Sequence, residues 1–301
     1  MINGIINVYK EKGFTSHDVV AKMRGILKIK KIGHTGTLDP DAIGVLPVCI
    51  GKGTKLVDFI TDKDKTYEAV LKLGITTDTQ DITGMVQTTS PVNVEFERIR
   101  EVIMSYIGEY DQLPPMYSAI KINGKKLYEL ARQGKEVERE RRRVVIHNIR
   151  ILNYNPNEHE VTMSVDCSKG TYIRTLLHDI GSDLTCGGTM KSLIRTAVGN
   201  FKLEDALKLS EIETLVKEEK IEEYVVEVDS LFQHYNKIIV KRDFHKLIYN
   251  GNAFSMEHIK DMQEDIVFGT VRVYDEDDNF IGIYCYKQDD KLFKPVKMFL
   301  S

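Results

Sequence analysis

Hydrophobic and polar residues alternate in several stretches of the chain, and a period of two is typical of half-buried strands. The alternation is regular over residues 65–74 and 161–167. Shorter alternating runs at residues 270–275 and 280–284 flank an acidic turn, so they predict two strands joined by that turn. The apolar positions of the two longer runs are Tyr67, Ala69, Leu71 and Leu73 in the first, and Val161, Met163, Val165 and Cys167 in the second.

Apolar residues at helical spacing predict three amphipathic helices. The first begins at Thr15 or Ser16, because either hydroxyl can cap a helix. The other two cover residues 99–107 and 173–184. The apolar face of the first helix comprises Val19, Val20, Met23, Ile26 and Leu27, and that of the last comprises Ile173, Leu176, Leu177, Ile180 and Leu184.

The chain has 301 residues and a formal net charge of −3, so it can bury a substantial core without a strong charge bias. No apolar run approaches the roughly 18 residues of a membrane span, and no signal-peptide pattern opens the sequence. The four cysteines stand singly, which is neither a disulfide framework nor a zinc-ligand spacing. This usage fits a reducing compartment, so we expect a cytoplasmic protein.

Charge is distributed unevenly along the chain. Residues 1–200 carry 28 Lys and Arg against 24 Asp and Glu, whereas residues 201–301 carry 14 against 21. The first part can therefore present a basic face, although a small surplus does not identify a nucleic-acid binder. Within the acidic part we expect a solvated helix over residues 218–227, followed by a linker around residues 232–237.

A glycine-rich polar loop at residues 33–42 precedes an apolar run at residues 43–50. Glycine permits backbone angles that other residues resist, and Pro40 holds Asp39 in an extended conformation. The Asp39 carboxylate should therefore project from a stiff turn that the apolar run anchors to the core. Such a segment fits two interpretations: an ordinary Asp-Pro turn beside His34, or part of an active site.

The same stretch carries a long motif. In sequence order it is Gly33-His34-Thr35-Gly36-Thr37-Leu38-Asp39-Pro40-Asp41-Ala42-Ile43-Gly44-Val45-Leu46-Pro47. The motif resembles the signature of the tRNA pseudouridine synthase B family, and residues 77–84 and 168–176 resemble two further motifs of that family. The resemblance implies that the protein converts the T-loop uridine (U55) of tRNA into pseudouridine, with Asp39 as the catalytic carboxylate.

Arg174 is the second residue that the motifs single out. It falls in the first turn of the predicted helix over residues 173–184, where the helix dipole is positive and a cation needs an anion nearby. A phosphate or a carboxylate would satisfy that need. The family resemblance pairs this arginine with the catalytic aspartate, so an Asp39–Arg174 contact is expected on both grounds.

The resemblance also implies which residues meet the target base. Tyr67 corresponds to an aromatic ring that lies against the base, and stacking on any base is worth about 1–3 kcal/mol. His34 is expected to fill the space that the flipped base vacates. Leu193 is expected to line the uracil pocket, and Tyr172 to contact the substrate beside Arg174.

Four polar residues are expected to support the loop or to contact RNA. Lys10 should support the loop beside the substrate, and Asp81 should lie behind the catalytic groups. A calcium loop at residues 77–84 is excluded because its ligand pattern and closing glutamate are missing. Lys121 and Arg141 belong to residues 113–143, which the resemblance makes an RNA-clasping insertion, although charged runs are usually solvated surface.

The resemblance further implies a fold and partners. It predicts an α+β pseudouridine synthase fold over residues 1–232, with a mixed, mostly antiparallel central sheet flanked by helices. Residues 233–301 are expected to form a small β domain like the PUA RNA-binding module, because residues 292–299 are similar to the end of such domains. The expected partner is the T arm of tRNA, bound by a monomer. No metal or other cofactor is expected, because the isomerisation transfers no electrons and loses no group.

Two other functions stay open. A non-catalytic tRNA-binding or folding module could keep the same scaffold, but it would not need a carboxylate that faces a polyanion. A pseudouridine synthase could also act on another RNA, with or without a guide. The joint presence of Asp39, Tyr67, Tyr172 and Arg174 favours the enzyme.

Overall fold

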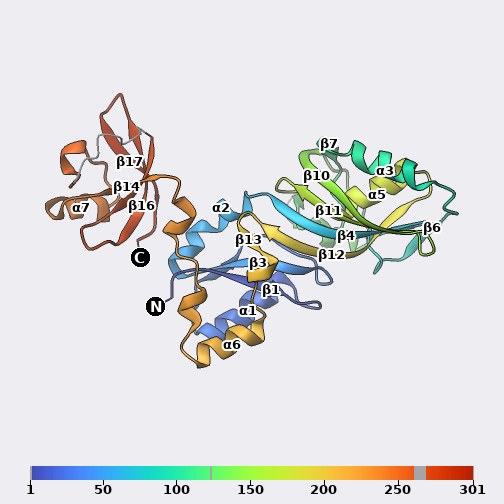
Figure 1. Ribbon diagram of the computed structural model, residues 1–301, viewed down its shortest axis with the longest axis horizontal. Coiled ribbons are helices and arrows are strands. Elements are labelled where there is room, and N and C mark those ends of the chain that lie inside the picture. The colour runs from blue at the N-terminus through green and yellow to red at the C-terminus, as the bar shows by residue number, and fades with distance from the viewer. Residues whose placement is uncertain (1, 123, 261–268, 301) are drawn as a thin grey trace.

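The computed structural model describes residues 2–122, 124–260 and 269–300. Within these residues, a nine-stranded sheet flanked by helices precedes a separate four-stranded sheet (Figure 1). The strands of the large sheet are β1 (Gly4–Lys10), β2 (Ile32–His34), β3 (Ile43–Ile50), β4 (Lys65–Leu73), β7 (Gly108–Gln112), β10 (Arg142–Asn155), β11 (Glu160–Cys167), β12 (Gly188–Val198) and β13 (Phe201–Lys202).

The large sheet is mixed and mostly antiparallel, as expected. Its order is β1-β3-β12-β4-β11-β10-β7, with β13 beside β12 and β2 beside β3. The parallel pair in it joins β12 to β3, where Ile194 pairs with Ile43 and Arg195 with Gly44. This pairing brings the strand that follows the glycine-rich loop against a strand that begins more than a hundred residues later. Chemistry-bearing residues from distant motifs can therefore meet there.

Helices cover the large sheet near both of its ends (Figure 1). Apolar side chains of α1 and α6 pack with those of β1 and β3, and side chains of α3 and α5 pack with those of β4, β10 and β11. The helices are α1 (Ser16–Leu27), α2 (Val57–Thr61), α3 (Phe96–Ser105), α4 (Leu127–Ala131), α5 (Ile173–Asp183), α6 (Leu209–Lys217) and α7 (His245–Tyr249).

The sequence pattern accounts for the elements that carry the candidate residues. Helix α1 begins at a capping box, in which Thr15 Oγ1 accepts from Asp18 N at 3.1 Å and Thr15 N donates to the Asp18 carboxylate at 2.8 Å. In β4, buried and half-buried residues alternate along the whole strand, as the period of two predicts. Helix α5 buries Ile173, Leu176 and further residues of its apolar face against the sheet. These three predicted elements are confirmed.

The smaller sheet has the strand order β14-β15-β16-β17. Its strands are β14 (Asn236–Ile239), β15 (Thr270–Tyr274), β16 (Phe280–Lys287) and β17 (Leu292–Met298). The two predicted strands correspond to β15 and β16. The small sheet contacts the large one through an apolar cluster in which Phe232 and Phe299 meet Ile5, Val45 and Leu56.

The prediction of a solvated helix over residues 218–227 is wrong. Helix α6 ends at Lys217, a short 3-10 helix covers Ile221–Tyr224, and Val226 exchanges two backbone hydrogen bonds with Ile5 at 2.9 and 2.8 Å. The segment is held because Ile221 is buried in the core beneath α1 and α6. The acidic composition of the segment suggested a solvent-exposed helix and gave no indication that Ile221 is buried.

The predicted linker around residues 232–237 is also wrong. Phe232 is only 4% exposed and lies at the centre of the cluster between the two sheets, where it contacts Phe59 and Phe280. Strand β14 begins at Asn236, within the same segment. The connection between the sheets is therefore packed.

Among the described residues, no helix has the length and apolar character that crossing a membrane requires.

Short elements outside the two main sheets border the candidate site. Strands β5 (Ile75–Thr77) and β6 (Val86–Thr89) form one hairpin, and β8 (Lys121–Ile122) pairs with β9 (Lys125–Lys126) in another. Further 3-10 helices are η1 (Gly51–Leu56), η2 (Leu203–Asp205), η4 (Asp229–Phe232), η5 (Arg242–Phe244) and η6 (Met256–His258), besides the one at Ile221–Tyr224.

Candidate active site

The loop that carries Asp39 is fixed by two hydrogen-bond donors from outside it. Lys10, at the end of β1, is fully buried, and its ammonium donates to Pro40 O at 3.1 Å and to Ala42 O at 2.5 Å. Gly13 N donates to Pro40 O at 2.9 Å. Burial lowers the pKa of the Lys10 ammonium to about 8. Lys10 therefore supports the loop, as expected, and its buried ammonium is not available to an RNA phosphate.

Asp39 and Arg174 form an ion pair, with Arg174 Nε 3.0 Å from the Asp39 carboxylate. The expected contact is confirmed. Arg174 is 6% exposed, whereas the Asp39 side chain is 40% exposed, so the carboxylate is open to a substrate while its partner is buried. Burial raises the pKa of the Asp39 carboxyl above its ordinary value, and the positive charge of Arg174 opposes that rise.

Arg174 is held by three further groups, which together fix its planar guanidinium. Its Nη1 lies 3.5 Å from the Asp81 carboxylate and donates to Thr79 O at 3.1 Å. Its Nη2 donates to Tyr117 O at 2.8 Å. Asp81 thus lies behind the Asp39–Arg174 pair, where the sequence placed it. The buried arginine also ties the loop before β6 to the base of the 113–143 segment.

Tyr67 lies in β4 with 8% of its surface exposed. Burial raises the pKa of its hydroxyl, and the charge of Arg195 and a hydrogen bond from it act in the opposite direction. The phenol is therefore neutral over the ordinary pH range. Its strand partner in β12 is Arg195, and Leu193 of β12 pairs with Ala69, two residues further along β4.

Arg195 is a site residue that the sequence analysis missed. It is 2% exposed, and its Nε donates to Val45 O at 2.7 Å while Nη2 lies 3.4 Å from Gly36 O. The two carbonyls lie on either side of Asp39, so one buried guanidinium fixes both flanks of its loop. A signal was present: Leu193 and Arg195 are two residues apart in a strand, so the arginine had to share the face of a buried leucine.

His34 and Tyr172 come from two different elements, and the charges of Arg174 and Asp39 act on the Tyr172 hydroxyl. His34 ends β2, is half-buried, and meets the ring of His17 edge-on at 5.2 Å between ring centroids. Burial and the nearby His17 lower the pKa of His34, so its ring is neutral near pH 7. Tyr172 precedes α5, where its backbone is fixed by two hydrogen bonds to the Gln112 side chain at 2.7 and 2.9 Å.

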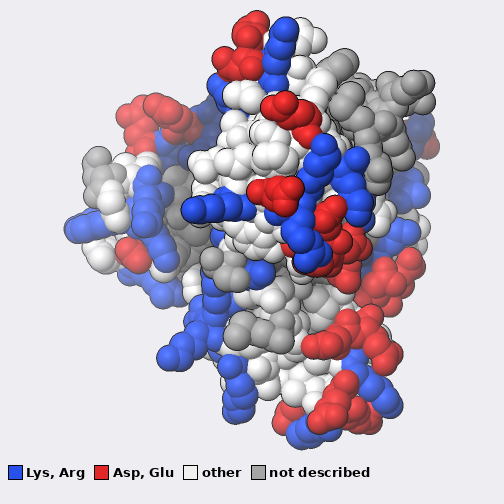
Figure 2. Space-filling model, turned by 90° about the vertical axis from the view of Figure 1, so that its left-hand side faces the viewer, with Lys and Arg blue, Asp and Glu red and all other residues white. Residues whose placement is uncertain are grey.

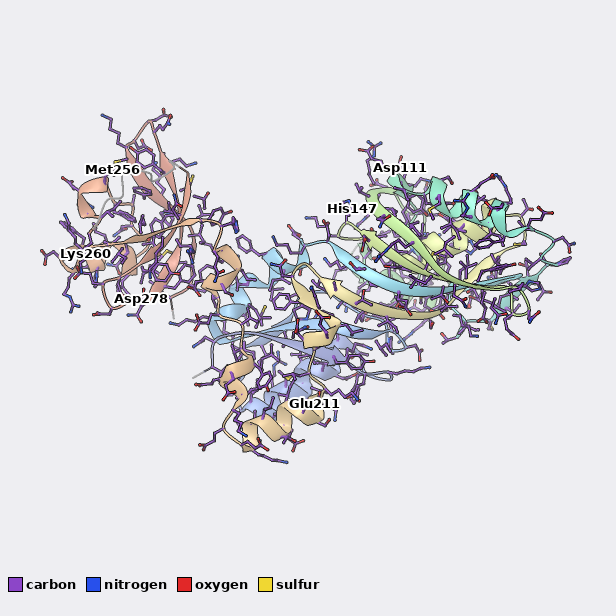
Figure 3. All side chains as sticks on the ribbon, in the orientation of Figure 1. Asp111, His147, Glu211, Met256, Lys260 and Asp278 are labelled. Atoms are coloured by element: carbon purple, nitrogen blue, oxygen red, sulfur yellow. The ribbon has the colours of Figure 1, made fainter. Side chains whose placement is uncertain are left out.

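Lys121 and Arg141 have no contact with the Asp39–Arg174 pair among those described. Lys121 is exposed in the β8–β9 hairpin. Arg141 donates at 2.9 Å to the backbone carbonyl of Asp111, the β7 residue labelled in Figure 3. Arg139, which lies between them in sequence, donates to Pro114 O at 3.0 Å. The ends of the 113–143 segment are thus fixed, while the roles of Lys121 and Arg141 stay predictions.

Substituting Arg195 with methionine is expected to lower the free energy of unfolding by about 2 to 3 kcal/mol. The substitution keeps the aliphatic bulk but removes the donor to the buried Val45 O and to the half-buried Gly36 O. Arg24 is a matched control, because it also donates to two carbonyls, Lys30 O and Ile32 O, but is exposed so that water can replace it. Denaturant unfolding of both variants measures the difference, and equal losses would contradict a special role for Arg195.

The chain matches two family descriptions. Residues 24–173 match the TruB family pseudouridylate synthase (N terminal domain), and residues 174–233 match the tRNA pseudouridylate synthase B C-terminal domain. Relatives named tRNA pseudouridine synthase B include a protein from Lachnoclostridium phytofermentans, 57% identical over 99% of this chain and 100% of its own length. Another, from Bacillus velezensis, is 41% identical over 100% of this chain and 99% of its own length.

Solved structures give the same result for the fold. The crystal structure of a Cbf5-Nop10-Gar1 complex matches with a TM-score of 0.72 and 27% identity, over 99% of this chain and 85% of that one. An H/ACA RNP bound to a substrate RNA containing 2′-deoxyuridine matches with a TM-score of 0.70 and 26% identity, again over 99% and 85%. The expected pseudouridine synthase fold is confirmed, and the chain belongs to the TruB family of pseudouridylate synthases.

Proposed function

We propose that this pseudouridylate synthase isomerises the T-loop uridine of tRNA, with Asp39 as its catalytic carboxylate. The observation that carries the proposal is the Asp39–Arg174 pair, in which a half-exposed carboxylate is held by a buried guanidinium at 3.0 Å. Relatives that are 41% to 57% identical are named tRNA pseudouridine synthase B. Those names favour tRNA over another RNA as the substrate.

The reaction breaks the bond from N1 of uracil to C1′ of ribose, turns the base, and joins C5 to C1′. Positive charge develops at C1′ as the first bond breaks, and a carboxylate can stabilise or trap such a centre, as it does in glycosidases. Asp39 must be ionised for this, and Arg174 favours the ionised form against the effect of burial. The base leaves with the electron pair of the N1–C1′ bond. When C5 bonds to C1′ it gives up its hydrogen as a proton, and N1 gains a proton, so uridine and pseudouridine contain the same atoms and electrons.

The remaining residues around the pair are assigned to the base. A uracil within a loop must leave its stack before N1–C1′ can be reached, at a cost of a few kcal/mol. The neutral rings of Tyr67 and His34 can stack with bases in place of the neighbouring bases of the RNA loop, and Leu193 offers an apolar edge. In this proposal Tyr67 and Leu193 contact the target base, and His34 fills the space that the base leaves in the RNA loop. Tyr172 contacts the substrate beside Arg174.

Binding of the rest of the tRNA is assigned to two further parts of the chain. Residues 113–143, with Lys121 and Arg141, close over the T arm as an RNA-clasping insertion of the 1–232 catalytic domain. Residues 233–301 act as a PUA-like RNA-binding domain. The exposure of Lys121 and Arg141 supports the first assignment, and the small sheet β14–β17 supports the second. One chain carries all of these parts, so a monomer is sufficient.

Mapping of pseudouridine in an unmodified tRNA transcript tests the proposed function. Carbodiimide adducts that stop reverse transcription are expected at the T-loop uridine and at no other position. A transcript with cytidine at that position should give no stop. Modification of other uridines with equal efficiency would contradict the assignment of the substrate.

Catalysis is expected to persist in full after exhaustive treatment with a chelator. The proposed steps need no Lewis acid, since the Asp39 carboxylate supplies the charge that acts at C1′ and Arg174 keeps that carboxylate ionised. Among the described residues, the potential metal-ligating group His245, Asp275 and Asp277 lies in the part of the chain that forms the small sheet. Single-turnover rates on a prefolded T-arm stem-loop measure the effect, and a chelator-sensitive rate restored by a divalent cation would contradict a metal-free mechanism.

A further inference from the structure

Four lysines from three separate segments meet where the two sheets join. Lys31 immediately precedes β2, Lys52 and Lys55 lie in η1, and Lys297 lies in β17. A hydrogen bond of 2.8 Å from Gly51 N to the Lys31 carbonyl brings the first two segments together. We call these four residues the junction lysines. Three of them lie in segments that flank strands β2 and β3 of the large sheet, and the fourth lies in a strand of the small sheet.

Contacts across the junction hold Lys55 and Lys297 in place. The Lys55 ammonium donates to the carbonyl of Leu300, just beyond β17, at 2.8 Å. The Lys297 ammonium lies over the ring of Phe59, 5.0 Å from its centroid, in a cation–π contact. Both contacts join the η1–α2 segment to β17 or to the residue just beyond it, so the positions of the charges are set by the packing of the two domains.

The junction lysines repel one another electrostatically. Burial, followed by the positive charges of Lys31, Lys52 and Lys297, lowers the pKa of Lys55. None of the ion pairs found in residues 2–122, 124–260 and 269–300 involves these four lysines, whereas other surface lysines are paired. On the face of this end of the molecule that Figure 2 shows, Lys and Arg project at the lower left, whereas Asp and Glu lie together with some Lys and Arg at the lower right. An anion placed among these lysines would relieve their repulsion.

Lys31 connects the junction lysines to the catalytic loop through one short strand. Strand β2 begins with Ile32 opposite Ile50 and ends with His34 opposite Val48, directly before the Asp39 loop. A strand rises about 3.3 Å per residue, so Lys31 and His34 are about 10 Å apart. A polyanion that enters the active site at His34 can therefore reach Lys31 within a few nucleotides.

We propose that the junction lysines bind the phosphate backbone of the RNA substrate, next to the nucleotide whose base enters the Asp39 site. The proposal rests on the proposed function for the identity of the RNA. Lysine binds phosphate as a point charge, and each neutralised phosphate releases counterions from the RNA. Because Lys297 belongs to the small sheet, one stretch of backbone bridges both domains, and the last part of the chain contributes to RNA affinity through this junction.

The test replaces Lys31, Lys52 and Lys297 with glutamine in the full chain and leaves Lys55, whose ammonium holds Leu300. Binding of an unmodified tRNA transcript is measured between about 50 and 200 mM salt. The plot of log K against log salt is expected to become shallower by about two to three, at roughly 0.7 to 0.9 per phosphate no longer contacted. At about 0.1 M salt the affinity should fall by about 10- to 100-fold.

A matched variant replaces three surface lysines that are already paired with carboxylates. Lys202, Lys217 and Lys220 lie 3.6, 3.0 and 2.9 Å from Glu204, Glu213 and Glu218 respectively. Changing them to glutamine removes the same net charge, but the wild-type affinity and salt slope should be retained. Unfolding temperatures of both variants check that each is folded.

The proposal is overturned if the junction variant keeps the wild-type salt slope, or if both variants lose affinity equally, since net charge alone would then account for the loss. It is also overturned if the junction variant binds the transcript as the wild type does and has lost only the binding of inorganic phosphate. Failure of the proposed function would show differently, because the wild-type protein would bind the transcript yet form no pseudouridine.

Discussion

Isomerisation of tRNA is expected to fall by at least about a thousandfold when Asp39 is replaced by asparagine. Asparagine keeps the shape of the side chain but carries no charge, so it cannot stabilise or trap the positive centre at C1′. The affinity for tRNA should stay within several-fold of the wild type, because a carboxylate contributes nothing to phosphate binding. Nucleoside analysis after a single turnover measures the first effect, and filter binding measures the second.

Asp41 provides the control for this experiment, since it lies on the same loop but is exposed and 3.7 Å from Lys12. Asp41→Asn should isomerise tRNA at the wild-type rate. Arg174 keeps Asp81 and two backbone carbonyls as partners in the Asp39→Asn variant, so the fold should be retained. Turnover by Asp39→Asn within tenfold of the wild type would remove Asp39 from the catalytic role.

Substituting Arg174 with alanine should be nearly as damaging at neutral pH, and the loss should depend on pH. The pKa of Asp39 is raised by burial and lowered by Arg174, so removing the arginine raises that pKa further. The carboxylate then ionises only at higher pH. We expect a rate loss of about a thousandfold near pH 6 and about a hundredfold near pH 7 that narrows further as the pH rises, because each unit between the pH and the pKa changes the ionised fraction about tenfold.

Single-turnover rates across the pH range measure this shift on a T-arm stem-loop. Arg174→Lys keeps a positive charge and should recover part of the rate at neutral pH, which separates charge from the loss of the planar hydrogen-bond donor. Arg100→Ala, which removes an exposed arginine paired with Glu97, is the control. If folded Arg174→Ala shows the wild-type pH profile, the arginine does not control the ionisation of Asp39.

The parts of the site that could be predicted are those that obey local rules. Pro40 restricts Asp39 whatever the fold, and the helix dipole requires an anion near Arg174 wherever that helix packs. The structure supplies that anion as Asp39 at 3.0 Å. Likewise, the period of two assigns Tyr67 to the buried face of β4 without knowledge of any partner strand.

The parts that could not be predicted depend on pairing between distant segments. Arg195 is decisive only because β12 runs parallel to β3, which brings its guanidinium to Val45 O and Gly36 O. The hydrophobic pattern within β3 or within β12 does not indicate that these two strands pair. The predictions for the acidic residues 218–227 and for the apolar Phe232 are wrong for the same reason, since the residues that they contact lie far away in sequence. These are Ile5 for the first, and Phe59, Phe280 and Phe299 for the second.

Release of tritium from the C5 position of uridine in an unmodified tRNA transcript tests the central claim most directly. The hydrogen at C5 leaves only when C5 bonds to C1′, so its appearance in solvent reports the proposed bond exchange itself. One equivalent of tritium per tRNA is expected from the wild-type protein, and none from Asp39→Asn at the same saturation. Retention of the label by wild-type protein that binds the transcript, or equal release by the Asp39→Asn variant, would contradict the account.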